Sequence, residues 1–191
     1  EMFDGRKGYE LLSSDIYHTP DIIAFTGGPD VDPANYGEKA IAGTWPDPER
    51  EAMNLKVWSK YPNLPKVGIC FGGQWLNCMS GGRMWQDVDN HGRDHRAVNL
   101  LSFRGYEAGE TMNVTSTHHQ MMIAGDKGEV IMIAHRAKKY LSEFAAPRPR
   151  FDTEVVWYES TKSLCFQPHP EYSTFPSHRD YFFALLEYLN G

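Results

Sequence analysis

Short apolar runs alternate with helical patterns along the chain, and this alternation predicts an α/β fold. The first expected strand is Asp21–Thr26, which ends at a Gly-Gly-Pro turn. A helix is expected to start at Asp47, because an acidic N-cap followed by Pro48 is typical of a helix N-terminus, and to run to about Lys60. Its spacing predicts an inward face of three residues, Ala52, Leu55 and Trp58.

The segment from Lys66 onward predicts a buried strand, Lys66–Ile69, that leads directly into Cys70 and then a helix, Gln74–Met79. The rest of the chain is richer in β patterns. The expected strands there are Arg83–Val88, Ala97–Leu101, Thr111–Val114, Glu129–Ala134, Glu154–Glu159 and Ser163–Phe166. A final helix, Ser177–Leu189, is expected to face inward with Tyr181, Phe182, Leu185, Leu186 and Leu189.

Length and composition fit one folded domain over residues 1–191, with 41% hydrophobic and 23% charged residues. The formal net charge of -6 argues against a surface that coats nucleic acid. No apolar run approaches the roughly 18 residues that a membrane helix needs. We therefore expect neither a nucleic-acid partner nor a membrane partner.

The cysteines are three in number, Cys70, Cys78 and Cys165, and none is in a CxxC pattern. An odd count without this spacing argues against a disulfide framework and against a cysteine-built zinc site, and favours a cytoplasmic location. Cys78 lies within a predicted helix and Cys165 within a predicted strand. We expect both to be core residues.

Cys70 stands at the centre of a G-x-C-x-G pattern, Gly68 to Gly72, at a predicted strand-to-helix junction. A nucleophile on such a sharp turn needs glycines on both sides, because side chains there would collide with the neighbouring strand or helix. The helix N-terminus behind the sulfur favours a thiolate. The pattern alone is equally compatible with an inert, buried cysteine beside packing glycines.

His169 lies between two prolines in the segment Gln167 to Glu171, directly after a predicted strand. The prolines restrict the backbone, and Glu171 can accept a hydrogen from the imidazole and fix its tautomer. Taken by itself, this segment is more typical of a surface histidine in a proline-rich turn. Paired with the Cys70 junction, it predicts the base of a cysteine nucleophile.

A third turn follows the first expected strand, with the sequence GGPDVDP from Gly27 to Pro33. Free backbone N–H groups in a Gly-Gly turn can bind an oxyanion, and the N–H of Phe71 is a candidate second donor. The alternative is an ordinary glycine turn whose acidic residues cap the next segment.

Together these motifs resemble the class I (triad) glutamine amidotransferase superfamily, and most of all its γ-glutamyl hydrolase group, peptidase family C26. The matching segments are GGPDVDP with Tyr36-Gly37-Glu38, GICFGGQWLNCMSGGRMWQDV, Ser116 to Gln120 (STHHQ), and QPHPEY. They occur in the order of the family, from residue 26 to residue 172. The resemblance implies a flavodoxin-like three-layer α/β/α sandwich with a mostly parallel central sheet.

The same resemblance assigns roles to individual residues. It implies Cys70 as nucleophile, His169 as base and Glu171 as the group that orients the base. The amides of Gly28 and Phe71 would form the oxyanion hole. The residues that it implies for substrate binding are Gln74, Ser116, His118 and His119.

The chain departs from the family pattern in three places. Phe71 stands where Arg or Leu is common, which matters little because the backbone of this residue does the work. The segment Ala134–Asp152 is longer and more basic than usual. The strand that normally opens the fold is absent before Glu1, so we expect an incomplete N-terminus.

Two further groups of residues are candidate sites. His91, Asp94 and His95, with His118 and His119, have the side-chain types of a cation site, but their spacing fits no common zinc pattern. We therefore expect no metal and no other cofactor, and place His91 and His95 in a loop beside the pocket. The basic segment His135–Arg150 fits a solvated loop or a docking surface for an acidic partner or substrate.

The chemistry so implied is cleavage of a γ-glutamyl amide through a cysteine thioester. We favour a glutaminase that supplies ammonia to a separate synthetase or ATP-dependent amide ligase, since no acceptor-binding or ATP-binding pattern is present. One alternative is a stand-alone γ-glutamyl hydrolase acting on γ-glutamyl amines or peptides. Another is a catalytically silent relative that only binds a partner or ligand.

Overall fold

The computed structural model describes residues 20–144, 147–172 and 174–191. The expectation of an incomplete N-terminus concerns a part of the chain that lies outside these residues. The helices are α1 (Pro48–Lys60), α2 (Phe71–Met79) and α3 (Pro176–Asn190). The strands are β1 (Ile23–Phe25), β2 (Lys66–Ile69), β3 (Arg83–Trp85), β4 (Asp87–Val88), β5 (His95–Asn99), β6 (Thr111–Val114), β7 (Met121–Ile123), β8 (Glu129–Ala134), β9 (Tyr140–Leu141), β10 (Asp152–Tyr158) and β11 (Ser163–Phe166).

Nine of the described strands form one sheet whose main path runs β1-β2-β11-β10-β8-β5-β6, and β4 pairs with β9 in a second, two-stranded sheet. β1 pairs with β2 and β2 with β11 in parallel, whereas β10, β8, β5 and β6 follow in antiparallel order. β7 pairs with β10 and β3, also antiparallel. The sheet is therefore mixed, and among its described strands the parallel pairs are those of the three strands at the β1 end. The expectation of a mostly parallel sheet holds for that part alone.

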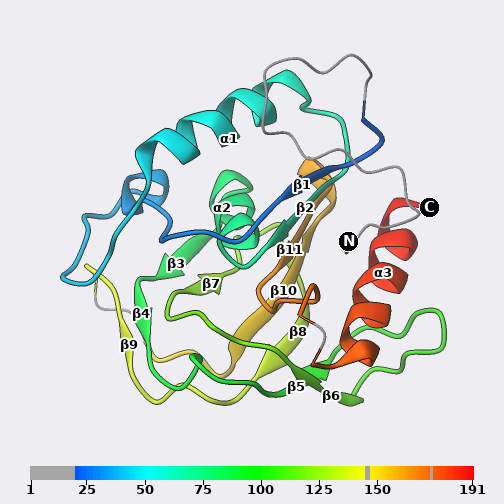
Figure 1. Ribbon diagram of the computed structural model, residues 1–191. Helices are drawn as coiled ribbons and strands as arrows, with labels where there is room; N and C mark the ends of the chain where they lie inside the picture. Colours follow the sequence, from blue (N-terminus) through cyan, green and yellow to red (C-terminus); the bar gives the residue numbers. More distant parts are fainter. Residues whose placement is uncertain (1–19, 145–146, 173) are drawn as a thin grey trace.

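Helices α1 and α2 lie on one side of the sheet and α3 on the other (Figure 1), and a hydrophobic core lies on each face, so the three layers are as expected. Along β10 and β11 the side chains alternate: Val155, Trp157 and Phe166 pack in the core that holds α3, and Val156 and Cys165 pack in the core that holds α2. This period-2 alternation is what a sheet covered on both faces requires. As expected, Tyr181, Phe182, Leu185 and Leu186 of α3 are buried, and Leu189 packs against them.

The predicted elements are confirmed with adjusted bounds. The expected strands at residues 66–69, 111–114, 129–134 and 163–166 have the bounds predicted for them. The single strand expected at Arg83–Val88 is two strands, β3 and β4, which belong to different sheets. The helix after Cys70 begins at Phe71, three residues earlier than expected, and β7 and β9 were not predicted.

The inward face predicted for α1 is confirmed at Trp58, which packs against the core, and is wrong for Ala52 and Leu55. Asp47 does cap the helix, accepting a hydrogen bond from Arg50 N at 3.1 Å, but Ala52 and Leu55 are exposed. The partly buried positions are Arg50, Glu51, Asn54, Val57 and Trp58, which also have helical spacing. The first two of these positions are Arg50 and Glu51, which form hydrogen bonds to the loop after β1. A prediction based on hydrophobic side chains alone therefore misses part of the buried face of α1.

Among the described residues, we find no helix whose length and apolarity would let it cross a lipid bilayer.

Candidate active site

Cys70 lies between β2 and α2, in the turn that the sequence predicts. Its backbone has φ 51° and ψ -114°, a left-handed conformation that side-chain-bearing residues rarely adopt. Such strain costs about 1–3 kcal/mol and persists where the surrounding structure enforces it. Here the amide of Cys70 donates a hydrogen bond to Phe166 O of β11 at 2.9 Å, which fixes the turn against the sheet.

The glycines around Cys70 are needed for close packing. A methyl group on Gly68 would lie 2.2 Å from the carbonyl carbon of Gly72, and one on Gly72 would lie 2.0 Å from Phe25 O in β1. A methyl group on Gly73 would lie 2.8 Å from Phe166 N in β11. The backbone of α2 therefore lies directly against three strands, and this close approach holds the N-terminus of α2 immediately behind the sulfur.

His169 is held by its backbone, by a carboxylate and by an aromatic ring. Its N–H donates to Thr115 Oγ1 at 3.1 Å, and the Thr115 hydroxyl donates to His169 O at 2.6 Å. The Nδ1 atom donates to Glu171 Oε1 at 2.6 Å, and the ring of Tyr172 stacks on the imidazole at 4.6 Å. The predicted pairing of His169 with Glu171 is thus present in the structure.

Cys70 and His169 approach the same glycine. A methyl group on Gly27 would lie 3.2 Å from Cε1 of His169 and 3.9 Å from Cβ of Cys70. Burial opposes a positive charge on His169, but the Cys70 sulfur and the Glu171 carboxylate outweigh it and raise the pKa of the imidazole to about 9. The Nε2 atom, which Glu171 leaves free, is buried and has no hydrogen bond to any described residue. This geometry suits proton exchange between the sulfur and the imidazole.

The other two cysteines are buried, as expected. Burial raises the pKa of both Cys78 and Cys165, so their thiols stay protonated at neutral pH. Neither has the glycine-flanked turn of Cys70.

The predicted oxyanion donors, Gly28 and Phe71, lie together. A methyl group on Gly28 would be 3.2 Å from Cδ1 of Phe71. Phe71 is the first residue of α2, so its N–H is among the four that have no acceptor within the helix. Arg50 covers the Phe71 ring, with its guanidinium 5.2 Å from the ring centroid, and donates to the Gly27 carbonyl at 2.8 Å.

Of the four residues implied for substrate binding, His119 has a partly exposed side chain. It lies between Asp30, at 2.9 Å from Nε2, and Asp87, at 3.3 Å from Nδ1, and the hydrogen bond to Asp30 raises its pKa. Gln74, Ser116 and His118 are at most 5% exposed. Cys70 and His169 are buried to a similar degree, so the role of these three residues in substrate binding stays a prediction.

Hydrogen bonds of the buried side chains of Gln74 and Gln120 connect all four motifs. The amide of Gln74 donates to Gln120 O and to Gln167 Oε1, both at 3.1 Å. The Gln120 side chain accepts from Val31 N at 3.0 Å. The nucleophile helix, the STHHQ segment, the QPHPEY segment and the GGPDVDP turn are therefore held as one unit.

The structure places His91 and His95 in the interior, which corrects their expected position in a loop beside the pocket. They are 0% and 6% exposed. His91 lies with His118 and Glu154 in a group whose ligand atoms are all within 4.8 Å of one another. His119 takes no part in this group.

The basic segment His135–Arg150 lines a hollow of about 290 Å³ that continues to Asp152. Arg148 donates to Ala137 O at 3.1 Å across it. The hollow carries five basic or histidine side chains: His135, Arg136, Lys138, Arg148 and Arg150. Whether this segment is a solvated loop or a docking surface stays a prediction.

Three residues of the site escaped the sequence interpretation: Thr115, Arg50 and Tyr172. Thr115 immediately precedes the STHHQ motif, and Tyr172 ends the QPHPEY motif, but neither had been given a role. Arg50 carried a usable signal, because a basic residue in the first turn of a helix opposes the helix dipole and needs another partner. That partner is the turn at Thr26 and Gly27.

Comparison with known proteins identifies the family. Residues 10–144 match the sequence profile described as Peptidase C26, which covers more than half of the chain. The chain belongs to the peptidase C26 family. The resemblance drawn from the four motifs is thereby confirmed.

Two curated relatives agree with membership of the peptidase C26 family. YvdE of Lactococcus lactis, named as glutamine amidotransferase-like, is 32% identical over 163 residues, which are 70% of this chain and 68% of that protein. Rv2859c of Mycobacterium tuberculosis, to which a glutamine amidotransferase function is ascribed, is 32% identical over 159 residues, 74% of this chain and 51% of that protein. The chain spans about two thirds of the first relative and half of the second.

Solved structures agree on the fold. A Thermoplasma acidophilum protein, to which the role of one component of a GMP synthase is ascribed, covers 90% of this chain and 96% of its own, with 14% identity and a TM-score of 0.54. A glutamine amidotransferase from Thermotoga maritima covers 89% of this chain and 86% of its own, with 12% identity and a TM-score of 0.51. This member of the peptidase C26 family therefore has the glutamine amidotransferase fold.

Proposed function

We propose that the protein hydrolyses the side-chain amide of glutamine through a thioester on Cys70. The observation that carries the proposal is the approach of Cys70 and His169 to the same glycine, with Glu171 hydrogen-bonded to the far nitrogen of the imidazole. A nucleophile, a base and a group that orients the base are the three parts that acyl transfer needs.

In the first half of the reaction, Cys70 passes its thiol proton to Nε2 of His169, and the resulting thiolate attacks the side-chain carbonyl carbon of glutamine. The carbonyl oxygen becomes an oxyanion, which the amides of Gly28 and Phe71 stabilise. His169 then donates its Nε2 proton to the departing nitrogen, so that the C–N bond breaks, ammonia leaves and a glutamyl thioester stays on Cys70.

In the second half, His169 accepts a proton from water as the water attacks the thioester carbonyl. The C–S bond breaks, glutamate leaves and the thiolate is restored. Glu171 keeps the imidazole in one orientation throughout, because Nδ1 donates to it in both protonation states of the ring.

The runner-up substrate is a γ-glutamyl amine or peptide, favoured by the match to peptidase C26. Both reactions form the same thioester and differ in the leaving group. Turnover of glutamine and of γ-glutamyl amines by the purified protein separates them. Faster release of glutamate from the amines than from glutamine would select the hydrolase, and no turnover of either would favour a silent relative.

The ammonia acceptor in this proposal is a separate synthetase or amide ligase. Relatives ascribed to glutamine amidotransferases support such a partner, and the basic hollow at residues 135–152 offers a charged surface for an acidic one. Co-purification from native extract with this protein as bait, followed by a glutamine-dependent synthetase assay of the complex, tests this. Activity of the complex with free ammonia but not with glutamine would contradict the assignment.

The pH profile tests the His169–Glu171 pair. The pKa of His169 is raised to about 9, so the imidazolium that protonates the leaving group is lost above that pH, and kcat/KM is expected to fall there. Replacing Glu171 with Gln removes a negative charge that stabilises the imidazolium, so the alkaline limb is expected to move to lower pH, with a drop in kcat of about 10²–10⁴-fold. An unshifted alkaline limb in Glu171→Gln would contradict the pairing.

Arg50 is expected to position the oxyanion turn. Its guanidinium holds Thr26 Oγ1 and the Gly27 carbonyl, so Arg50→Ala should let this turn move and lower kcat by about 10–100-fold with little change in KM, since transition-state stabilisation is lost. Lys56→Ala is the matched control, because it removes an exposed positive charge from the same helix. Equal kinetics of the two variants would exclude this role.

A further inference from the structure

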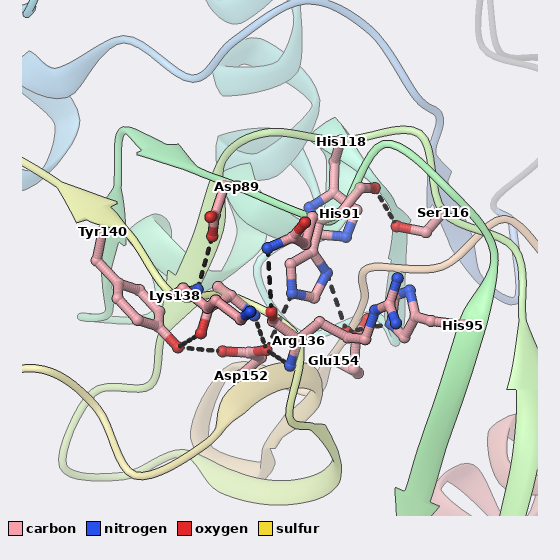
Figure 2. Close-up of polar contacts among 12 residues, drawn as sticks. Asp89, His91, His95, Ser116, His118, Arg136, Lys138, Tyr140, Asp152 and Glu154 are labelled. Carbon is pink, nitrogen blue, oxygen red and sulfur yellow. Dashed lines mark hydrogen bonds and ion pairs between the residues drawn. The ribbon is translucent and has the colours of Figure 1, made fainter.

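A second group of chemically reactive side chains lies in the interior, apart from Cys70. We call His91, His118 and Glu154, with their neighbours Asp152 and His95, the inner histidine cluster. Figure 2 shows His91 at its centre, with His118 on one side and Asp152 and Glu154 on the other. The rings of His91 and His118 have centroids 4.8 Å apart. All five residues are at most 6% exposed.

Three polar atoms of this cluster have no hydrogen-bond partner among the described residues. They are Nδ1 of His91, Nε2 of His118 and Oε2 of Glu154, and all three are buried. Leaving one buried polar group unsatisfied costs about 1–3 kcal/mol. Three such atoms in one place point to a bound species that satisfies them together.

The hydrogen bonds that are present reveal what these three atoms offer. His91 Nε2 donates to Asp152 Oδ2 at 3.0 Å, and His118 Nδ1 donates to Gln120 O at 2.8 Å, since a carboxylate and a carbonyl can only accept. In the neutral imidazoles, the unpartnered nitrogens therefore carry lone pairs.

The charges around these lone pairs favour a cation. His91 Nδ1 faces the Glu154 carboxyl group, at 3.5 Å from Oε1. Asp152 and Glu154 are two buried carboxyl groups in this cluster, and His91 and His95 contact them through hydrogen bonds. A single water has only two hydrogens for three acceptors, whereas one cation can accept all three electron pairs.

We propose that His91 Nδ1, His118 Nε2 and a carboxylate oxygen of Glu154 bind a divalent transition-metal ion, with zinc the best fit. Two imidazole nitrogens and one carboxylate oxygen form a ligand set that suits zinc. The other nitrogen of each imidazole is bonded to a carboxylate or a backbone carbonyl, the arrangement that usually orients metal-binding histidines.

Binding of one zinc ion requires the three ligand atoms to move closer together. The three ligand atoms lie within 4.8 Å of one another, whereas bonds of about 2.0–2.1 Å to one zinc ion place ligand atoms about 3.4 Å apart. Binding would therefore require small side-chain movements that keep the hydrogen bonds of His91 and His118 to Asp152 and Gln120. His95 holds the other carboxylate oxygen, Oε1, at 2.9 Å.

The ion would join three segments that are distant in the sequence: the loop after β4, the loop between β6 and β7, and β10. The second of these loops also supports the active site. Ser116 Oγ donates to His91 O, and the preceding residue, Thr115, holds the backbone of His169. The proposed role is therefore structural, and it is independent of the proposed reaction.

The test uses the full chain without a histidine tag and in a Cys70→Ala background, so that the Cys70–His169 pair cannot bind the metal. After treatment with chelator, zinc is titrated and the metal content is measured by mass spectrometry. We expect one zinc per chain, and an unfolding temperature about 5–10 °C higher at free zinc 100-fold above the dissociation constant. X-ray absorption of this zinc form should show two imidazoles at about 2.0–2.1 Å.

Three variants in the same background complete the test. Glu154→Gln and His118→Gln keep the size of the side chain or a hydrogen-bonding group and should weaken zinc binding at least tenfold. His135→Gln, an exposed histidine outside the cluster, should bind zinc like the parent. The proposal is overturned if the parent binds no stoichiometric zinc, if its absorption spectrum lacks imidazole ligands, or if both ligand variants bind zinc as tightly as His135→Gln.

Discussion

Replacing Cys70 with Ala is expected to lower the hydrolysis of glutamine by on the order of 10⁴-fold or more, because the thioester cannot form without the sulfur. The fold should persist, since an alanine methyl group fits the space of the lost side chain. Steady-state release of ammonia by the purified variant, with circular dichroism to verify folding, measures this effect.

Cys78→Ala is the matched control for this experiment. Cys78 is buried in α2 and its thiol is held in the protonated form, so its loss should leave turnover within about twofold of the parent. A glutamine-mimicking chloroketone should label Cys70 in preference to Cys78 and Cys165. A Cys70→Ala variant that keeps more than about one hundredth of the parent turnover would refute the proposed nucleophile.

Replacing Gly72 with Ala is expected to destabilise the fold by about 3 kcal/mol or more. The added methyl group would lie 2.0 Å from Phe25 O, a backbone atom of β1 that no side-chain rotation can move away. α2 would have to shift from the sheet, and the turn that holds Cys70 would shift with it. Chemical denaturation measures the loss of stability, and we expect soluble variant protein to lose activity as well.

Gly92→Ala provides the comparison for Gly72→Ala. Gly92 is exposed, and a methyl group on it would meet nothing within 4 Å. The free energy of unfolding of the Gly92→Ala variant should therefore stay within about 0.5 kcal/mol of that of the parent protein. Equal stability of the Gly72 and Gly92 variants would show that α2 does not depend on the close approach to β1.

Local signals were enough to single out the candidate reactive residues. Asp47 and Pro48 favour the start of a helix through their own backbone and side-chain chemistry, independently of the tertiary structure. The glycines around Cys70 indicate a tight strand-to-helix junction, because such a junction has no room for side chains at these positions. The order of four short motifs was enough to find the family. These inferences succeed because each depends on neighbours only a few residues apart.

Other features could not be predicted from such signals. The inward stripe of α1 carries Arg50 and Glu51, whose partners lie in the loop after β1, so a rule based on hydrophobicity selected the exposed Ala52 and Leu55 instead. The burial of His91 and His95 depends on β10, about 60 residues later, which supplies the carboxylates that bind them. No local pattern in the sequence contains that pairing.

The sequence by itself therefore determined the family, the nucleophile candidate and the positions of most helices and strands, because these depend on short-range backbone chemistry and spacing. Tertiary structure alone decided which strands run parallel, which implied substrate residues are buried, and how histidines and carboxylates from three segments gather in the interior. The physical reason is that burial and charge pairing arise between residues far apart in the chain, and only packing brings them within reach.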